Sequence, residues 1–250
     1  MTVTILGCGS SCGVPMINCD CFTCQSTNIK NKRTRSSIFF ETKETKILID
    51  TTPDLRQQCL KNNIKKLDAI IYTHDHADHV AGIDDVKQLC ENKKPIDVYI
   101  DDHTFTSLGK RYDYIFNPSQ PFCPMIQRKK LESFQKIGDV NVTAFEQMHG
   151  SVVSQGIRLN NIAYSTDFHQ IPSSSLEKLK NLDIWIIDCL RYFYTPNHSY
   201  LEKSLLLIEL LKPKLAVLTH MAHEIEYEEI SKILPKNVIA AYDNLKIHTS

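Results

Sequence analysis

The stretch YTHDHADHVAG, Tyr72 to Gly82, governs the interpretation of the whole chain. Three histidines and two aspartates fall in the six positions from His74 to His79, although the chain of 250 residues holds only ten histidines. The residues just before it, Asp68–Thr73 (DAIIYT), form a nearly continuous apolar run that predicts a strand buried on both faces. The cluster of titratable side chains therefore begins where a buried strand ends.

The spacing inside this cluster suits metal ions. His74 and His76 are two positions apart, so in extended backbone their side chains point the same way. Asp78 and His79 add a carboxylate and an imidazole before the chain turns helical. Neutral imidazole suits zinc or manganese, and a carboxylate can bridge two ions. A polar loop with Asp78 capping a helix would explain one aspartate and none of the histidines, so we expect two neighbouring metal ions.

The rest of the chain predicts one layered α/β domain over residues 1–250, with strands first and then strands interleaved with helices. Apolar and β-branched runs predict strands at Val3–Leu6, Ser37–Glu41, Lys46–Asp50, Asp68–Thr73, Val142–Phe145, Ile162–Ser165, Ile184–Asp188, Leu215–Thr219 and Val238–Ala241. Helices are expected at Asp54–Asn62, Val80–Glu91, Ser174–Leu182, Ser199–Leu211 and Tyr227–Leu234, two of them opened by capping boxes at Ser174–Glu177 and Ser199–Glu202.

Composition narrows the classes of partner. Lysine plus arginine equals aspartate plus glutamate at 29 each, so net charge gives no reason to expect a membrane or an extended nucleic acid as partner. The basic clusters Lys30–Arg35 and Arg128–Lys130 are interpreted as solvated loop charge. The start of the chain does not look like a signal peptide, and nine cysteines indicate a reducing compartment. We expect a cytoplasmic protein, and a homodimer is left open.

The histidine cluster and its downstream partners carry a family resemblance. His74-x-His76-x-Asp78-His79 resembles the signature of the metallo-β-lactamase superfamily, and His149, Asp167 and His220 match in order. The resemblance implies a four-layer αββα sandwich with a dinuclear site between the sheets. It implies that one metal is held by His74, His76 and His149, that the other is held by Asp78, His79 and His220, and that Asp167 bridges them. The ions expected are manganese or zinc.

The cysteines point to a branch of that superfamily. Cys19-x-Cys21-x-x-Cys24 matches a structural zinc knuckle, placed at about residues 17–26, which needs a fourth ligand from elsewhere. The arrangement is similar to the PhnP-type cyclic phosphodiesterases, which also share Gly13-Val14-Pro15, Arg33–Ser37, Asn197-His198 and the His220–His223 segment. By this resemblance His223 is the fourth ligand of one structural zinc ion.

The remaining cysteines and glycines carry less information. Gly7-x-Gly9-x-x-x-Gly13 has the wrong spacing for a dinucleotide fingerprint, so a tight loop is expected there. Cys8 and Cys12 lie in that loop, where the family more often has Thr, Ser or Gly. The last four cysteines have no spacing partner and are expected to be small core or surface residues: Cys59, Cys90, Cys123 and Cys189.

The resemblance also implies a reaction. A hydroxide bridging two metals attacks a small cyclic phosphodiester, such as a 2′,3′-cyclic nucleotide or cyclic ribose phosphate. The candidate catalytic residues are His198 and Asp78, with His198 as the proton donor to the leaving group. His198 precedes Ser199, the expected helix cap, and would face the end of a helix that favours anions. Asp50 and Asp188 follow or end strands and are expected to orient ligand histidines. The aromatic segment Leu190–Pro196 is expected to line the substrate pocket.

Two other functions compete with this one. A ribonuclease Z-like tRNA 3′ endonuclease shares the glycine loop and the metal motif, but the chain has no long Gly/Pro-rich insertion for a tRNA-clamping arm. A non-catalytic zinc-stabilised binding module would not need the complete ligand set. A PqqB-type protein has a similar cysteine knuckle but departs from the metal signature. No role is assigned to His103, His169 and His248.

Overall fold

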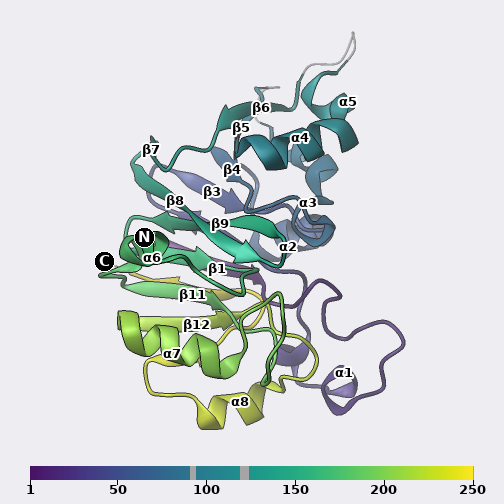
Figure 1. Cartoon of the computed structure of the whole chain (residues 1–250). Helices are drawn as coiled ribbons and strands as arrows, with labels where there is room; N and C mark the ends of the chain where they lie inside the picture. Colours follow the sequence, from purple (N-terminus) through teal and green to yellow (C-terminus); the bar gives the residue numbers. More distant parts are fainter. Residues whose placement is uncertain (91–93, 119–123, 250) are drawn as a thin grey trace.

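The computed structural model describes residues 1–90, 94–118 and 124–249, and two sheets of seven strands each face one another within them (Figure 1). The first sheet has the order β14 (Leu245–His248), β1 (Thr2–Gly7), β2 (Ser37–Glu41), β3 (Lys46–Ile49), β4 (Ala69–Ile71), β5 (Ile96–Ile100) and β6 (Ile126–Lys130). The second has the order β13 (Val238–Ala240), β12 (Leu215–Thr219), β11 (Ile184–Asp188), β10 (Ile162–Ser165), β9 (Val152–Leu159), β8 (Val140–His149) and β7 (Phe134–Ile137).

Helices cover the outer faces of both sheets. Those on the first sheet are α2 (Leu55–Asn62), α3 (Ala77–Val80), η2 (Ile83–Leu89), α4 (Asp102–Arg111) and α5 (Asp113–Phe116). Those on the second are α6 (Ser173–Leu176), η4 (Glu177–Leu179), α7 (Leu201–Leu211) and α8 (Tyr227–Ile233). The short α1 (Phe22–Gln25) and η1 (Ile29–Asn31) lie in the N-terminal segment that projects beside the sheets (Figure 1). The predicted four-layer αββα sandwich is confirmed.

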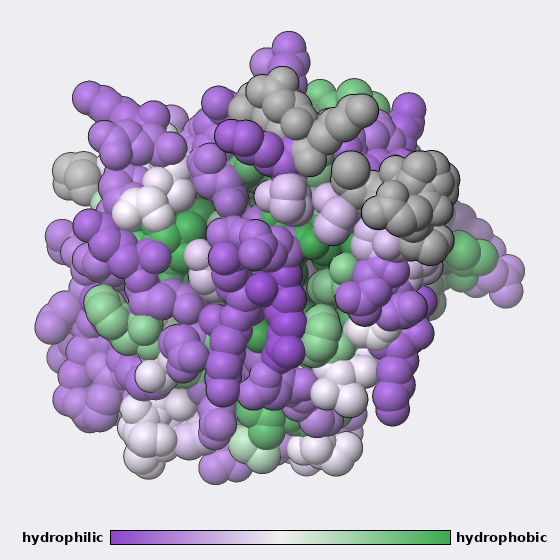
Figure 2. Space-filling view, turned by 90° about the horizontal axis from the view of Figure 1, so that it is seen from above, coloured by the Kyte–Doolittle hydropathy of each residue, from purple (hydrophilic) through white to green (hydrophobic). Residues whose placement is uncertain are grey.

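Alternation along the strands explains why the first sheet is buried on both faces. In β3, Ile47 and Ile49 join the core between the sheets, while Leu48 packs under the helices. In β4, Ala69 and Ile71 face the inner core and Ile70 the outer one. Because successive side chains of a strand point to opposite faces, a continuous apolar run fits a strand covered on both sides. Polar side chains predominate on the face that Figure 2 shows from above.

Several expected elements differ from those found. The predicted Ser199 capping box is wrong, because α7 begins after Tyr200 and the buried Ser199 hydroxyl is hydrogen-bonded to Ser204 Oγ at 2.7 Å. The Ser174 box is also wrong, because α6 begins after Pro172 and ends at Leu176. The helix expected at Val80–Glu91 is the short α3 followed by η2, and Glu91 lies outside the described residues, as does Cys123.

The basic clusters are not simply solvated loop charge. Arg33 is only 2% exposed, and the cluster Arg128–Lys130 belongs to β6. Arg128 and Lys130 both pair with Asp102, and Lys129 lies 3.8 Å from Asp97. No helix in the described parts of the chain is long and apolar enough to cross a membrane.

Candidate metal centre

The candidate ligands meet because strand ends meet. β3 and β4 run parallel, as do β10, β11 and β12, so their carboxyl ends share one edge of the two sheets. His74 follows β4, Asp167 follows β10 and His220 follows β12, while His149 is the last residue of β8. Residues far apart in the sequence thereby gather in one small volume.

The first trio consists of His74, His76 and His149, whose ligand atoms all lie within 4.8 Å of one another. His74 Nδ1 lies 3.0 Å from Thr73 Oγ1, and His149 Nδ1 donates to the carbonyl oxygen of Asn197 at 2.8 Å. Burial lowers the pKa of His74 and of His149, so both rings favour the neutral form. The tautomer of His149 therefore leaves its Nε2 lone pair free.

The second group consists of Asp78, His79, Asp167 and His220, again with ligand atoms within 4.8 Å of one another. Asp167 Oδ2 lies 3.1 Å from His79 Nε2, and Asp167 Oδ1 lies 3.4 Å from His220 Nε2 and 3.8 Å from His149 Nε2. Asp167 thus contacts residues of both groups, which is the position that a bridging carboxylate needs.

The charges in the second group balance one another. Burial by itself would raise the pKa of Asp78 and Asp167, but the neighbouring imidazoles hold both below their usual range. Burial likewise opposes the charge on His220, but Asp167 and Asp78 raise the pKa of that imidazole to about 9. A divalent cation bound to neutral imidazoles would supply the positive charge that protonated imidazoles otherwise give to these carboxylates.

The orientation of the imidazole nitrogens shows that the residues fit metal ions. The Nε2 atoms of His74, His79 and His220 are buried and make no hydrogen bond of good geometry with the described residues. Those of His79 and His220 face the carboxylates of Asp78 and Asp167 at 3.1–3.8 Å. His74 Nε2 faces no carboxylate, and a buried polar atom without a partner costs about 1–3 kcal/mol, so this position calls for a ligand. Imidazole nitrogens with a carboxylate between them match the donors that zinc and manganese accept.

A buried carboxylate supports the cluster from behind. Asp50, fully buried, accepts from His79 Nδ1 at 2.7 Å and from Thr73 Oγ1 at 2.8 Å. It also accepts from the Thr73 backbone N–H at 2.9 Å. The expected orienting role of Asp50 is therefore matched by direct contact with one candidate ligand and, through Thr73, with His74.

The backbone is left-handed at three of these positions. Asp50, Asp167 and His220 have φ values of 66°, 54° and 58°. Non-glycine residues seldom adopt this conformation, and such strain collects at functional sites. Asp50 and His220 directly follow β3 and β12, and Asp167 lies two residues beyond the end of β10, so all three turns lie at strand ends.

His198 adjoins both groups. Its ring stacks on His220 with 4.9 Å between centroids and meets His149 edge-on at 4.6 Å. His198 Nδ1 lies 3.1 Å from Asp188 Oδ2, so Asp188 holds this ring, whereas His220 Nδ1 is 3.8 Å from Asp188 Oδ1. The expectation that His198 directly precedes the cap of α7 is wrong by one residue, and Asp188 holds the ring instead.

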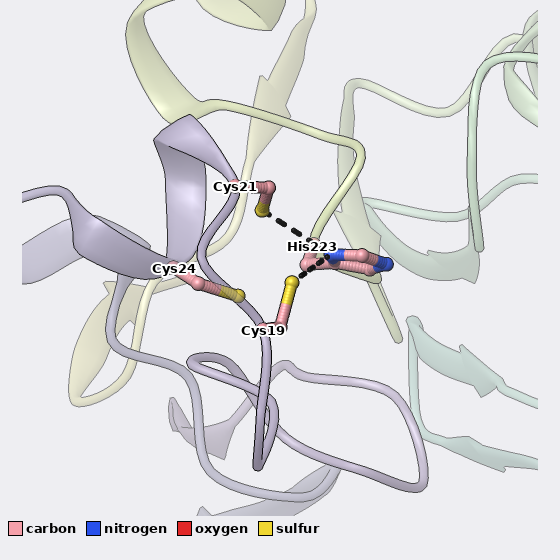
Figure 3. A group of neighbouring side chains, drawn as sticks. All are labelled: Cys19, Cys21, Cys24 and His223. Atoms are coloured by element: carbon pink, nitrogen blue, oxygen red, sulfur yellow. Dashed lines mark hydrogen bonds between the residues drawn. The ribbon is translucent and has the colours of Figure 1, made fainter.

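Three cysteines and one histidine form a separate cluster (Figure 3). Cys19 Sγ and Cys21 Sγ lie 3.2 and 3.3 Å from His223 Nδ1, and Cys24 Sγ accepts from the backbone N–H of Met16 at 3.3 Å. Burial opposes ionisation of Cys21, but hydrogen bonds from the Cys24 backbone and from His223 lower its pKa to about 6. A Cys₃His set with one thiolate already favoured matches a structural zinc site.

The N-terminal glycine loop joins this cluster to the strand end that bears His220. Gly9 pairs with Met221, and the Met221 backbone N–H donates to Cys8 O at 2.8 Å. The buried Arg33 donates to the carbonyl oxygens of Ala222 at 3.1 Å and Ile225 at 2.8 Å. These bonds hold the segment from His220 to His223, which carries one residue of each cluster.

Some contacts escaped prediction from the sequence. The partner of His149 is a backbone carbonyl, and His169, which had been given no role, accepts from the Gly150 N–H at 3.1 Å. Glu224 pairs with Arg191 at 3.5 Å beside His223. A backbone carbonyl has no residue signal at all, and Glu224 is noticeable only as the neighbour of His223.

Comparison with known proteins agrees with this geometry. The family model described as "Beta-lactamase superfamily domain" matches residues 45–221. A solved structure described as a new diphosphatase from the PhnP family shares 37% sequence identity with this chain. The two superpose with a TM-score of 0.93 over 98% of this chain and 96% of that one. Zn²⁺-bound PqqB from Methylobacterium extorquens is 19% identical with a TM-score of 0.81, over 100% of both chains, and shares the fold.

Two further relatives are more distant in sequence or in length. The short form of human tRNase Z is 19% identical with a TM-score of 0.69, over 99% of both chains, and also shares the fold. The octanoyltransferase of Porphyromonas gingivalis (strain ATCC BAA-308 / W83) is 34% identical over 98% of this chain but only 51% of its own length. The chain therefore spans about half the length of that relative.

Proposed function

We propose that this chain, which belongs to the beta-lactamase superfamily and is a metal-dependent hydrolase, cleaves small phosphodiesters with two divalent ions. The observation that carries the proposal is the position of Asp167 between the two groups of candidate ligands, 3.1 Å from His79 Nε2 in one and 3.8 Å from His149 Nε2 in the other. The likeness to a PhnP-family diphosphatase over nearly the whole chain supports phosphorus chemistry.

The ligand groups would divide the ions between them. His74, His76 and His149 would hold one ion, Asp78, His79 and His220 the other, and Asp167 would serve both. Such ions supply Lewis acidity and lower the pKa of bound water. Asp50 would keep His79 and, through Thr73, His74 turned toward the site. A third, structural zinc ion would bind Cys19, Cys21, Cys24 and His223.

His198 would give the leaving group its proton. The Asp188 carboxylate accepts from Nδ1 at 3.1 Å, which fixes the ring and leaves Nε2 for the substrate. An alkoxide is a poor leaving group, so proton transfer from a positioned acid accelerates its departure by about 10²- to 10⁴-fold. Among small phosphodiesters we favour cyclic ones, such as 2′,3′-cyclic nucleotides or cyclic ribose phosphate.

A second candidate substrate is a diphosphate. The PhnP-family relative at 37% identity is described as a diphosphatase. A phosphorus atom in a disubstituted diphosphate also bears two non-bridging oxygens, so the same site could take it. The leaving phosphate needs less help from His198, because it is a weaker base than an alkoxide.

The remaining alternatives have less support. The tRNase Z neighbour is 19% identical and supports the fold alone, and the formal net charge of zero does not favour a large polyanion. A non-catalytic module would not need the complete set of seven candidate metal ligands. The octanoyltransferase name belongs to a protein about twice as long, and the ligand groups favour hydrolysis over acyl transfer.

The test is a rate comparison. Initial rates on a 2′,3′-cyclic nucleotide and on a disubstituted diphosphate are measured with added manganese for the wild type and His79→Ala. The control is His103→Ala, which alters an exposed histidine in the first turn of α4. We expect His79→Ala to lose most activity and His103→Ala to keep it. A metal-loaded wild type inactive on both substrates would refute the proposal.

A further inference from the structure

The loop Arg191–His198 connects the two candidate metal sites. Hydrogen bonds close its base, from the Leu190 N–H to Ser199 O and from the Leu201 N–H to Arg191 O, both at 3.0 Å. A third bond runs from the Ala222 N–H to Leu190 O at 2.9 Å and ties the loop to the segment between His220 and His223. The loop is therefore anchored on the same segment that carries one candidate ligand of each site.

The far end of the loop contacts the dinuclear site. The carbonyl oxygen of Asn197 accepts from His149 Nδ1 at 2.8 Å, and His198 stacks on His220. Gly150 has φ of +60°, and a Cβ there would come within 2.9 Å of the Asn197 side chain. This close packing means that a shift of the loop would move both the proton donor and the partner of a candidate ligand.

The near end of the loop contacts the cysteine site. His223 turns Nδ1 toward the cysteines, and its other nitrogen, Nε2, lies 3.7 Å from Glu224 Oε2. The second oxygen of Glu224, Oε1, lies 3.5 Å from Arg191 Nη1. The Arg191 guanidinium lies over the Phe193 ring, 5.5 Å from its centroid. One carboxylate therefore stands between the cysteine-site histidine and the first residue of the loop.

The hydrogen bonding of this pair is incomplete. Glu224 Oε2 and Arg191 Nε are buried and have no hydrogen-bond partner among the described residues. A histidine that binds metal through one nitrogen usually donates its other N–H to a carboxylate or carbonyl. Glu224 Oε2, which lies 3.7 Å from His223 Nε2, is an acceptor available for that N–H.

We propose that Glu224 and Arg191 are positioning residues, which fix the loop Arg191–His198 against His223 and so place His198 and Asn197 at the dinuclear site. The inference rests on the proposed function. Glu224 orients His223 as a ligand, and through Arg191 it sets where the loop begins. Loss of the Glu224 charge removes the side-chain contact between Arg191 and His223, so the base of the loop is held by its backbone hydrogen bonds alone and the cysteine site is weakened at the same time.

The variant that tests this is Glu224→Gln, which keeps the size of the side chain and removes its charge. Rates are compared on a 2′,3′-cyclic nucleotide, whose alkoxide leaving group needs a proton, and on bis(p-nitrophenyl) phosphate, whose phenolate does not. We expect the variant to lose about tenfold more rate on the cyclic substrate. A general loss of folded structure would lower both rates equally, and that result would overturn the proposal.

A second readout does not depend on catalysis. Zinc release to an excess of chelator is followed by titration of the freed thiols, and we expect Glu224→Gln to release zinc about tenfold faster than the wild type. Unchanged release would exclude Glu224 as a partner of His223. If the wild type proved inactive on every phosphodiester, the proposed function would fail. The zinc release rate would still show whether Glu224 supports His223.

Coupling and specificity are tested with two more variants. Arg191→Gln should reproduce the leaving-group effect, and the double variant with Glu224→Gln should lose little more than either single change, because the pair acts as a unit. The control is Lys214→Gln, which breaks an exposed ion pair with Asp183 at 2.7 Å. Full additivity of the two changes, or an equal effect in the control, would contradict the proposed pairing.

Discussion

The buried carboxylate of Asp50 offers the sharpest test of how the metal centre is held. It accepts three hydrogen bonds, from His79 Nδ1, Thr73 Oγ1 and the Thr73 N–H, at 2.7, 2.8 and 2.9 Å. In Asp50→Asn the amide oxygen can keep the first two acceptor roles, but the amide nitrogen then faces the Thr73 N–H. One buried donor loses its acceptor, which costs about 1–3 kcal/mol.

The effect on metal binding follows from the same contacts. His79 loses a charged acceptor, and His74 is reached through Thr73, so both candidate ligand groups are disturbed. Removing such a supporting carboxylate typically lowers metal affinity 10- to 100-fold, equivalent to about 1.4–2.8 kcal/mol. Asparagine tolerates the left-handed backbone of position 50, so this change tests the carboxylate rather than the turn.

The assay is titration of the metal-stripped protein with manganese and with zinc, read by calorimetry. The control is Asp243→Asn, a half-buried carboxylate, which accepts from the backbone N–H groups of Thr34 at 2.8 Å and Cys8 at 3.2 Å. We expect both variants to lose stability but only Asp50→Asn to lose metal affinity. Unchanged affinity in Asp50→Asn, despite a lowered melting temperature, would refute the reasoning.

Three other outcomes are expected. His79→Ala should bind one active-site ion fewer by elemental analysis while its circular dichroism stays native, because its ring contacts the carboxylates of Asp50, Asp78 and Asp167 rather than the hydrophobic cores. Cys21→Ser should lose zinc and melt earlier, and unchanged zinc content and melting would exclude a zinc ion there. Burial raises the pKa of Asp243 to about 6 from an unfolded value of 3.8, so its stabilising contribution is full at acid pH and is lost as pH rises through 6. Urea unfolding should therefore show wild type losing about 2 kcal/mol relative to Asp243→Asn between pH 4 and pH 7, and a constant difference would contradict this.

Local patterns in the sequence predicted much of the fold, because its central strands are apolar runs. The strands expected at Ser37–Glu41, Ile162–Ser165, Ile184–Asp188 and Leu215–Thr219 have the same bounds in the structure. β9 (Val152–Leu159) was missed, since Ser154, Gln155, Gly156 and Arg158 give it little β character. The capping boxes failed because the tertiary structure gives Ser199 a different partner, Ser204, from the one its local sequence suggests.

Only the local part of the candidate site could be predicted from residue spacing. The cluster His74–His79 is local and could be found by spacing alone, whereas the grouping with His149, Asp167 and His220 came from a family resemblance. Only the alignment of strand ends explains that grouping physically, and strand order is not visible in a local pattern. Contacts such as Asn197 O with His149 need the folded chain, since any residue could offer that carbonyl.

The left-handed turns at Asp50, Asp167 and His220 have a consequence for protein engineers. At these positions an alanine scan measures two things, because alanine removes the side chain and also resists the backbone conformation by about 1–2 kcal/mol. Glycine removes the side chain and accepts the turn. The difference between an alanine and a glycine variant at one such position therefore reports the backbone strain, less the extra conformational entropy that glycine loses on folding. Anyone who transplants this centre to another scaffold must copy the three turns along with the ligands.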